Sequence, residues 1–377
     1  MKQDYIKNEL IKLTQDLIKF KTTKDHPKEI QKCMEYIKEY FKSSDLIIKE
    51  FVNNGKRSLY ISYTDTKKTR LLLNGHIDVV PAEEEQYSPY IKDNNIYGRG
   101  AVDMKAGVAS YMLLLKEIAK ENIKPDPDLA LMIVSDEEIG GCDGTRHLIE
   151  DKGYSADFAM ASEPGHASVD TLNITIAEKG VLWLKIKTRG VSCHGSRPWL
   201  GDNAIEKLMD KTREIKSLFS GTTKDNRWKT TMNIGTIKGG DTTNKVADSA
   251  QLTLDIRYTE ETDIPEILKK IKTVKNIEVD VLMQSSMLIN PDNVDLIDTL
   301  KEIAQKKTGK NVQLTKEHGA SDLRFTSARN IPSVIFGPYG NNHHGKDEHI
   351  SIQSLELYYQ VLEEFVKKTV VKEEYQK

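Results

Sequence analysis

Residues 71–78 have the sequence LLLNGHID, in which a short apolar run ends at a glycine and is followed by His76 and Asp78. A short apolar run bounded by a turn-forming residue is typical of a strand buried on both faces. In open α/β sheets, ligands bind beyond the carboxyl ends of the strands. We therefore predict a buried strand that delivers an imidazole and a carboxylate to a ligand-binding edge.

Three later segments repeat this order of apolar strand and polar side chain. They are residues 129–134, followed by Asp136, Glu137 and Glu138; residues 158–161, followed by Glu163; and residues 333–336, followed by His343 and His344. Because the carboxyl ends of parallel strands meet at one edge of a sheet, we expect these groups to converge in one crevice. The pattern predicts an α/β fold.

Amphipathic segments flank the predicted strands. Apolar residues recur at helical spacing over residues 5–41, with an interruption near 22–27, which predicts two helices on one face of the sheet. Residues 101–120 carry an apolar stripe with Asp103 near its start and are predicted to form another helix on that sheet. The last residues, 372–377, have the composition of a frayed tail.

The pattern changes between residues 173 and 287. Alternating stretches at 181–188, 231–237, 251–256 and 277–282 are interleaved with helical stretches at 203–219 and 263–272. Strands with helices on one face indicate an inserted α+β domain, and 377 residues are too many for one ordinary core. We therefore predict a discontinuous catalytic domain, residues 1–172 and 288–377, with an inserted domain at 173–287.

The composition argues against several classes of protein. Basic and acidic residues number 55 and 57, giving a formal charge of -2, which does not favour a nucleic-acid surface. We expect a cytoplasmic protein, because no apolar run approaches the roughly 18 to 20 residues that span a bilayer and the first residues lack a signal-peptide pattern. Cys33, Cys142 and Cys193 are widely separated and odd in number, which is typical of reduced thiols.

The polar groups of the predicted crevice form a ligand set for metal ions. Each motif alone is ambiguous, since a His-x-Asp sequence is common in turns and paired acids are common on surfaces. Together, two imidazoles and three carboxylates suit a pair of zinc ions, with one carboxylate bridging ions about 3.5–4 Å apart. Asp103 is the natural candidate for that bridge. A second acid beside a ligand, as in Glu137-Glu138, can serve as a base.

Four blocks of the sequence resemble, in order and spacing, the M20 metallopeptidase family, which includes acetylornithine deacetylases, succinyl-diaminopimelate desuccinylases, aminoacylases and glutamate carboxypeptidases. The blocks are GHIDVVP at 75–81, YGRGAVDMK at 97–105, DEEIGG at 136–141 and SEP at 162–164. The resemblance implies a zinc-aminopeptidase-like catalytic domain with a mixed central sheet. It also implies that residues 173–287 form a dimerisation domain that acts as a lid.

The resemblance further implies two divalent metal ions, with zinc expected first and cobalt or manganese as alternatives. His76 and Glu163 would hold one ion, Glu138 and His344 the other, and Asp103 would bridge them. The choice of His344 over the preceding histidine rests on the pattern HGKDE, which resembles the closing block of the family.

The same resemblance assigns the catalytic groups. Glu137 is expected to be the general base, and Asp78 to orient the imidazole of His76. The block GVSCHGS at 190–196 resembles the one whose histidine, here His194, reaches the active site of the neighbouring subunit and stabilises the oxyanion.

Further positions match residues that contact substrate in the family. They are Asn244, Arg257, Ser321 and Arg324. Arginine suits a substrate carboxylate because its planar fork donates two parallel hydrogen bonds, although a surface ion pair is the alternative for both arginines.

The expected protein is a homodimeric, metal-dependent amidohydrolase that cleaves the amide bond of a small N-acylated amino acid. A dipeptidase or carboxypeptidase is the alternative, because its substrates also present a free carboxylate. A non-catalytic binding module that keeps the fold is less favoured, since each expected ligand is present in the sequence.

Overall fold

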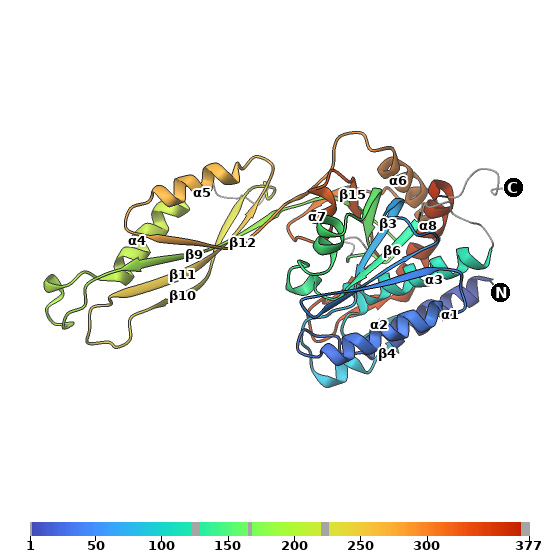
Figure 1. Ribbon diagram of the computed structural model, residues 1–377, viewed down its shortest axis with the longest axis horizontal. Helices are drawn as coiled ribbons and strands as arrows, with labels where there is room; N and C mark the ends of the chain where they lie inside the picture. Colours follow the sequence, from blue (N-terminus) through green and yellow to red (C-terminus); the bar gives the residue numbers. More distant parts are fainter. Residues whose placement is uncertain (1, 122–128, 165–167, 220–225, 371–377) are drawn as a thin grey trace. The chain divides into compact units, whose positions relative to one another are not determined.

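The computed structural model describes residues 2–121, 129–164, 168–219 and 226–370, so the expected tail at 372–377 lies outside the described residues. The chain divides into two compact units (Figure 1). The first comprises Met1–Ala177, Ile289–Thr315 and Ser321–Lys377, and the second comprises Glu178–Leu288 and Lys316–Ala320. The role of the inserted segment as a dimerisation lid stays a prediction.

A mixed sheet forms the centre of the first unit. Its order is β1 (Ile47–Asn53), β2 (Lys56–Ser62), β6 (Leu129–Val134), β3 (Lys68–His76), β7 (Ser155–Ala161), β15 (Ser333–Ile335), β8 (Ile174–Glu178) and β13 (Leu288–Ile289), with β14 (Leu314–Glu317) beside β8. Pairing is parallel from β6 through β3 and β7 to β15, and antiparallel at β1–β2, β2–β6 and β15–β8. This sheet confirms the predicted fold class.

The strands predicted from the apolar runs are the adjacent parallel strands β6, β3, β7 and β15. Side chains alternate between the faces of a strand. In β3, Leu71, Leu72 and Leu73 are nevertheless all buried, so both faces of the sheet are covered. Double coverage explains why these strands are continuously apolar.

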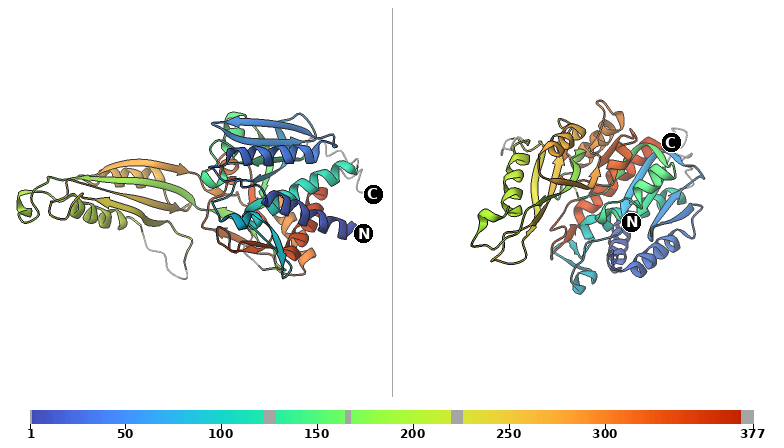
Figure 2. Two further views of the ribbon diagram at one scale, coloured as in Figure 1. Left: turned by 90° about the horizontal axis from the view of Figure 1, so that it is seen from below. Right: turned by 60° about the vertical axis from the view of Figure 1, so that its left-hand side comes forward.

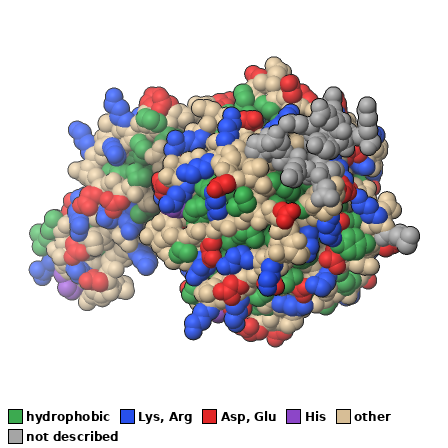
Figure 3. All heavy atoms as spheres, turned by 45° about the vertical axis from the view of Figure 1, so that its right-hand side comes forward, with side chains coloured by type: hydrophobic (Ala, Val, Ile, Leu, Met, Phe, Trp, Pro, Cys, Tyr) green, Lys and Arg blue, Asp and Glu red, His purple; other side chains and the backbone are tan. Residues whose placement is uncertain are grey.

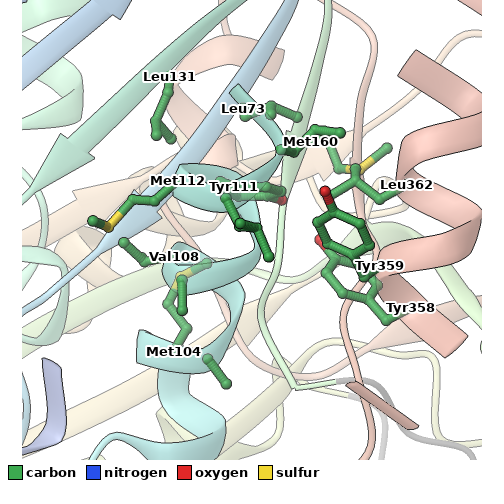
Figure 4. Packing of buried hydrophobic residues seen from close by; sticks show 14 of the residues in the cluster. Leu73, Met104, Val108, Tyr111, Met112, Leu131, Met160, Tyr358, Tyr359 and Leu362 are labelled. Atoms are coloured by element: carbon green, nitrogen blue, oxygen red, sulfur yellow. The ribbon is translucent and has the colours of Figure 1, made fainter. Parts of the chain in front are cut away.

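Helices bury the sheet in one large core. This core takes residues from α1 (Lys2–Ile18), α2 (Pro27–Phe41), α3 (Ala106–Lys120), α6 (Asp295–Thr308) and α8 (Ile352–Val370), while α7 (Leu323–Ser327) packs against β7 and β15. Figure 4 shows Tyr111 of α3 and Tyr358 and Leu362 of α8 beside Leu73 and Met160 of the sheet. Burial of each large apolar side chain contributes about 1.5–3 kcal/mol to the free energy of folding. This packing holds in place the strand ends that carry the site.

The helix predicted over 101–120 begins later than expected. α3 begins at Ala106, and Ala101–Lys105 form the irregular turn η2, in which Asp103 has φ -123° and ψ 93°. The backbone N–H groups of Val102 and Asp103 donate to the carboxylate of Glu348. The first N–H groups of a helix or turn have no carbonyl partner within it, and here a side chain accepts from two of these amides. Asp103 therefore lies in a turn before the helix.

A small antiparallel sheet joins two distant segments of the first unit. Its order is β16 (Gly340–Asn341), β17 (His349–Ser351), β5 (Asn95–Tyr97) and β4 (Tyr90–Lys92). His349 pairs with Tyr97, so the segment before Asp103 runs beside the segment after His344. Short helical turns are η1 (Glu84–Tyr87), η3 (Glu137–Ile139), η4 (His147–Asp151) and η5 (Pro198–Leu200).

The second unit is a two-layer α+β structure. Its antiparallel sheet has the order β10 (Thr231–Gly239), β11 (Ser249–Tyr258), β9 (Gly180–Arg189) and β12 (Glu278–Ser285). Leu182, Leu184 and Ile186 point to one face of β9 and share a core with α4 (Ala204–Lys216) and α5 (Ile264–Thr273). Figures 1 and 2 show both helices on that face. The side chains of Asn203 and Asp263 cap the two helices, as is typical at helix N-termini.

The surface matches the balanced composition. On the face shown in Figure 3, the Lys and Arg side chains are interspersed with Asp and Glu. Within the part of the chain that the structure describes, each helix is too short or insufficiently apolar to cross a bilayer.

Candidate metal centre

The carboxyl ends of the parallel strands deliver the predicted ligands. His76 is the last residue of β3, Glu138 lies in η3 directly after β6, and Glu163 follows β7 by two positions. Asp103 comes from η2, and His344 comes from the turn between β16 and β17. The structure places these side chains in two groups that could each hold an ion: His76, Asp103 and Glu163, and Asp103, Glu138 and His344.

Asp103 belongs to both groups because its two oxygens face different imidazoles. Oδ1 lies 3.1 Å from Nε2 of His76, and Oδ2 lies 3.1 Å from Nε2 of His344. Oε1 of Glu163 lies 3.6 Å from the first of these nitrogens, and Oε1 of Glu138 lies 3.2 Å from the second. A carboxylate shared in this way has the geometry of a bridge between two cations.

The hydrogen bond on the far side of His76 makes its ring a suitable ligand. Nδ1 lies 2.9 Å from the backbone carbonyl oxygen of Asp78, which can only accept, so Nδ1 carries the proton. In the neutral ring, Nε2 then directs a lone pair toward the oxygens of Asp103 and Glu163. Lone pairs facing carboxylate oxygens repel each other unless a cation lies between them. The donor set therefore fits a divalent metal ion.

The concentration of negative charge also shifts pKa values in the direction that favours a cation. Hydrogen bonds that the protonated ring of His344 donates to the carboxylates of Asp103 and Glu138 raise the pKa of His344 to about 10. Burial lowers the pKa of His76, but the charge of Glu163 and the bond to Asp103 outweigh it and raise that pKa well above its ordinary value. The centre thus holds positive charge strongly, as a proton or as a metal ion.

Asp78 holds the turn that carries the paired acids. Its carboxylate accepts hydrogen bonds from the backbone N–H of Glu137 at 3.3 Å and of Glu138 at 3.0 Å. The nearer carboxylate oxygen is 3.6 Å from Nδ1 of His76. Burial raises the pKa of Asp78 to about 7. The side chain therefore contacts both the metal-facing histidine and the backbone of η3.

Glu137 has the electrostatic environment of a proton-transferring group. Burial raises the pKa of its carboxyl group well above the ordinary value. The positive charge of His76 opposes this shift, while the negative charges of Glu163 and Asp322 reinforce it. Carboxyl groups whose pKa is raised by burial and by neighbouring negative charges are common among proton-transferring groups of active sites.

In the second unit, the structure brings His194 beside Asn244. The N–H of Gly195 donates to the backbone oxygen of Asn244 at 2.7 Å, and both predicted site residues are exposed. Nδ1 of His194 accepts a hydrogen bond from the N–H of Ser196 at 3.1 Å and lies 2.8 Å from the Ser196 hydroxyl. A neutral ring with an accepting Nδ1 carries its proton on Nε2, which can donate outward.

The predicted substrate-binding arginines differ in their surroundings. Arg257 is part-exposed, and its Nε donates to Asp255 at 2.9 Å. Arg324 is buried, and its guanidinium donates to the backbone oxygens of Ser321 at 2.7 Å and Gly140 at 2.8 Å. Arg324 thus holds the turn after Glu138, and Ser321 is itself buried. Substrate roles for these residues stay predictions.

Sequence reasoning assigned no role to Arg99, Glu348 or Ser196, although all three contact predicted site segments. Arg99 and Glu348 form a buried ion pair, and Glu348 accepts from the N–H of Asp103. The sequence could have pointed to Arg99 and Glu348, because both residues lie inside the motif blocks that carry Asp103 and His344.

Known proteins of similar sequence and fold are hydrolases. A succinyl-diaminopimelate desuccinylase of Helicobacter pylori is 29% identical over 379 residues, covering 92% of this chain and 95% of the relative. A tripeptidase of Staphylococcus aureus superposes with a TM-score of 0.76 at 24% identity, covering 97% of this chain and 98% of that structure. A dinuclear metal-binding M20 peptidase of Bacillus subtilis gives a TM-score of 0.70 at 14% identity, covering 97% and 99%.

The fold, the ligand groups and these relatives define a metal-dependent amidohydrolase or peptidase, an enzyme that hydrolyses C–N bonds. More narrowly, the chain belongs to Peptidase family M20/M25/M40, whose sequence profile matches residues 72–368. The resemblance noted in the sequence is therefore confirmed.

Proposed function

We propose that this protein is a two-ion amidohydrolase that releases the acyl group from a small N-acylated amino acid. The supporting observation is that the two carboxylate oxygens of Asp103 each lie 3.1 Å from a different imidazole nitrogen. The desuccinylase relative favours an N-acyl substrate. The similar fold of a tripeptidase makes a peptide substrate the alternative outcome of the test.

In this proposal, His76 and Glu163 would hold one ion, Glu138 and His344 would hold the other, and Asp103 would contribute to both. Zinc suits the nitrogen and carboxylate donors, and cobalt or manganese are the alternatives. When bound, the ions acidify water and polarise the scissile carbonyl group.

Glu137 carries the proton in the proposed reaction. Its carboxylate accepts a proton from the attacking water and later donates that proton to the nitrogen of the leaving amine. Asp78 supports this role by holding the N–H groups of Glu137 and Glu138, so the base and the adjacent ligand keep a fixed relative position.

His194 supplies the hydrogen bond to the oxyanion. The proton on its Nε2 suits this role, because the Ser196 N–H occupies Nδ1. By family resemblance, His194 acts in the active site of a second subunit, and residues 173–287 form the dimer contact. Arg257 and Asn244, on the same unit, would then contact the substrate. A cytoplasmic location belongs to this proposal too.

A combined metal and substrate assay tests the proposal. The metal-free protein is loaded with zinc, cobalt or manganese, and bound metal is counted by elemental analysis. Hydrolysis is then measured on N-succinyl and N-acetyl amino acids and on dipeptides and tripeptides. We expect two ions per chain and the highest kcat/KM on an N-acyl amino acid. A clear preference for peptides would replace the deacylase with a peptidase, and fewer than two ions would contradict the two-ion centre.

A further inference from the structure

We propose that the buried ion pair between Arg99 and Glu348 positions His344 and thereby sets the affinity of the protein for the ion that His344 helps to hold. This inference rests on the proposed function, because it assumes that His344 is a metal ligand. It concerns side chains that lie outside both ligand groups.

Glu348 ties the end of the small sheet to the bridging aspartate. Its side chain is 1% exposed. Oε1 accepts hydrogen bonds from the backbone N–H of Val102 at 3.1 Å and of Asp103 at 3.3 Å, while Oε2 pairs with Arg99. The carboxylate therefore fixes the turn that presents Asp103 to the metal centre.

Arg99 ties the same carboxylate to the backbone of the His344 turn. One guanidinium nitrogen pairs with Glu348, and the other donates to the backbone oxygens of His344 at 3.1 Å and Gly345 at 3.2 Å. Its side chain is 3% exposed, so these bonds form away from bulk water. The planar fork of the arginine lets one side chain serve the carboxylate and the carbonyl groups together.

The backbone of His344 needs such support. Its φ is 61°, in the left-handed region that residues with a side chain rarely adopt. Residues in this region persist where the surroundings hold them, and they cluster at functional sites. Here, the bonds from Arg99 to the carbonyl groups of His344 and Gly345 hold the turn, and the side chain of Gln86 adds a bond to Gly345 at 2.9 Å.

The geometry predicts unequal effects on the two ions. The fork of Arg99 contacts the turn of His344, whereas His76 is fixed at the end of β3 and by its bond to the Asp78 carbonyl group. Loss of the fork should therefore weaken the ion held by Asp103, Glu138 and His344 more than the ion held on the His76 side.

Zinc titration of the full chain against a chromophoric chelator tests this inference. R99K keeps the positive charge opposite Glu348 but loses the planar fork, and E348Q keeps the shape of the side chain but loses its charge. We expect R99K to weaken one ion about 10–100-fold and the other less than about 3-fold, and E348Q, which also alters the support of the shared Asp103, to weaken both ions. R57K is the matched control, since Arg57 pairs with Glu50 in a part-exposed site of the same unit; its two dissociation constants should equal those of the wild type.

A double-mutant cycle assigns the affected ion. H344A removes the proposed ligand and leaves the His76 side. If Arg99 acts through His344, R99K should not further weaken the remaining ion in the H344A background. Additional weakening there would show that Arg99 acts elsewhere and would overturn the inference.

Other outcomes separate this inference from the proposed function. Two ions in the wild type with unchanged or equally weakened ions in R99K would overturn the inference alone. Failure of both variants to fold, measured by thermal unfolding of metal-free protein, would assign the pair to general stability and also overturn it. Fewer than two ions in the wild type would overturn both the inference and the proposed function.

Discussion

The two compact units hold their predicted functional side chains in different ways. In the first unit, His76 and Asp78 are 1% and 3% exposed, and backbone groups of neighbouring segments fix both side chains. In the second unit, His194 and Asn244 are exposed and lie on neighbouring loops. The proposed ligand His76 is thus fixed within a packed core, whereas His194 and Asn244, proposed to meet the oxyanion and the substrate, lie on exposed loops, where proteins vary specificity at little cost to stability.

The largest expected effect is that of D103N, which tests the proposed metal ligands of the first unit. The substitution removes the charge shared by both ligand groups, so we expect both ions to weaken by more than about 100-fold, since loss of a ligand exceeds the usual effect of losing an outer partner. Hydrolysis should fall to background. Elemental analysis after dialysis measures the bound metal. D157N, at an exposed acid on β7, is the control and should bind like the wild type. Retention of one tight ion in D103N would refute the bridge.

E137Q separates chemistry from ion binding within the same core. Glutamine cannot accept the proton of the attacking water, so kcat should fall by about 10²–10⁴-fold while two ions remain bound. Single-turnover kinetics and elemental analysis measure the two quantities. Substantial residual turnover would exclude Glu137 as the base, and loss of an ion would make it a ligand instead.

H194A tests the loop side of the contrast. Removal of the proposed oxyanion donor should lower kcat by about 10²–10³-fold, with both ions and the unfolding temperature unchanged. If His194 acts in a second subunit, a mixture of H194A and E137Q chains should regain activity, because one site of each mixed dimer then has both groups. Chains mixed after separate purification provide the measurement, and absence of recovery would contradict a shared site.

The smallest expected effect is that of S196A. The backbone N–H of Ser196 still donates to Nδ1 of His194 in this variant, so only the hydroxyl contact is lost. We expect kcat to fall by less than about tenfold, consistent with a single hydrogen bond worth about 1 kcal/mol. S192A in the same loop is the control. A loss as large as that of H194A would show that the hydroxyl contact fixes the imidazole.

The sequence predicted the parallel strands well because their signal is local. LLLNGHID and LALMIVSDEE each combine a buried strand with its polar end, and both strands lie where expected. The predicted start of the helix at residue 101 was wrong, because Asp103 and Met104 lie in a turn with non-helical backbone angles. The amides of Val102 and Asp103 in this turn bond to the carboxylate of Glu348, 245 positions from Asp103 along the chain. Propensity within a window cannot include such a distant acceptor.

The same limit applies to the candidate site. The motif blocks indicated which residue types could bind metal ions, but not which ring nitrogen of His76 or His194 carries the proton. That depends on the carbonyl group of Asp78 beside His76 and on the amide of Ser196 beside His194. Arg324 matched a substrate-contacting position, yet its bond to the Gly140 carbonyl group is a tertiary contact that no local pattern encodes.

The position of β15 between β7 and β8 has a consequence for biosynthesis. β15 is synthesised after all residues of the second unit, Glu178–Leu288 and Lys316–Ala320. Until then, β7 lacks its parallel neighbour on that side, and an unpaired strand edge is a template for association with other chains. Nascent chains that stall before residue 333 should therefore depend on chaperones more than completed ones, and no fragment that lacks residue 344 can assemble the full set of proposed ligands.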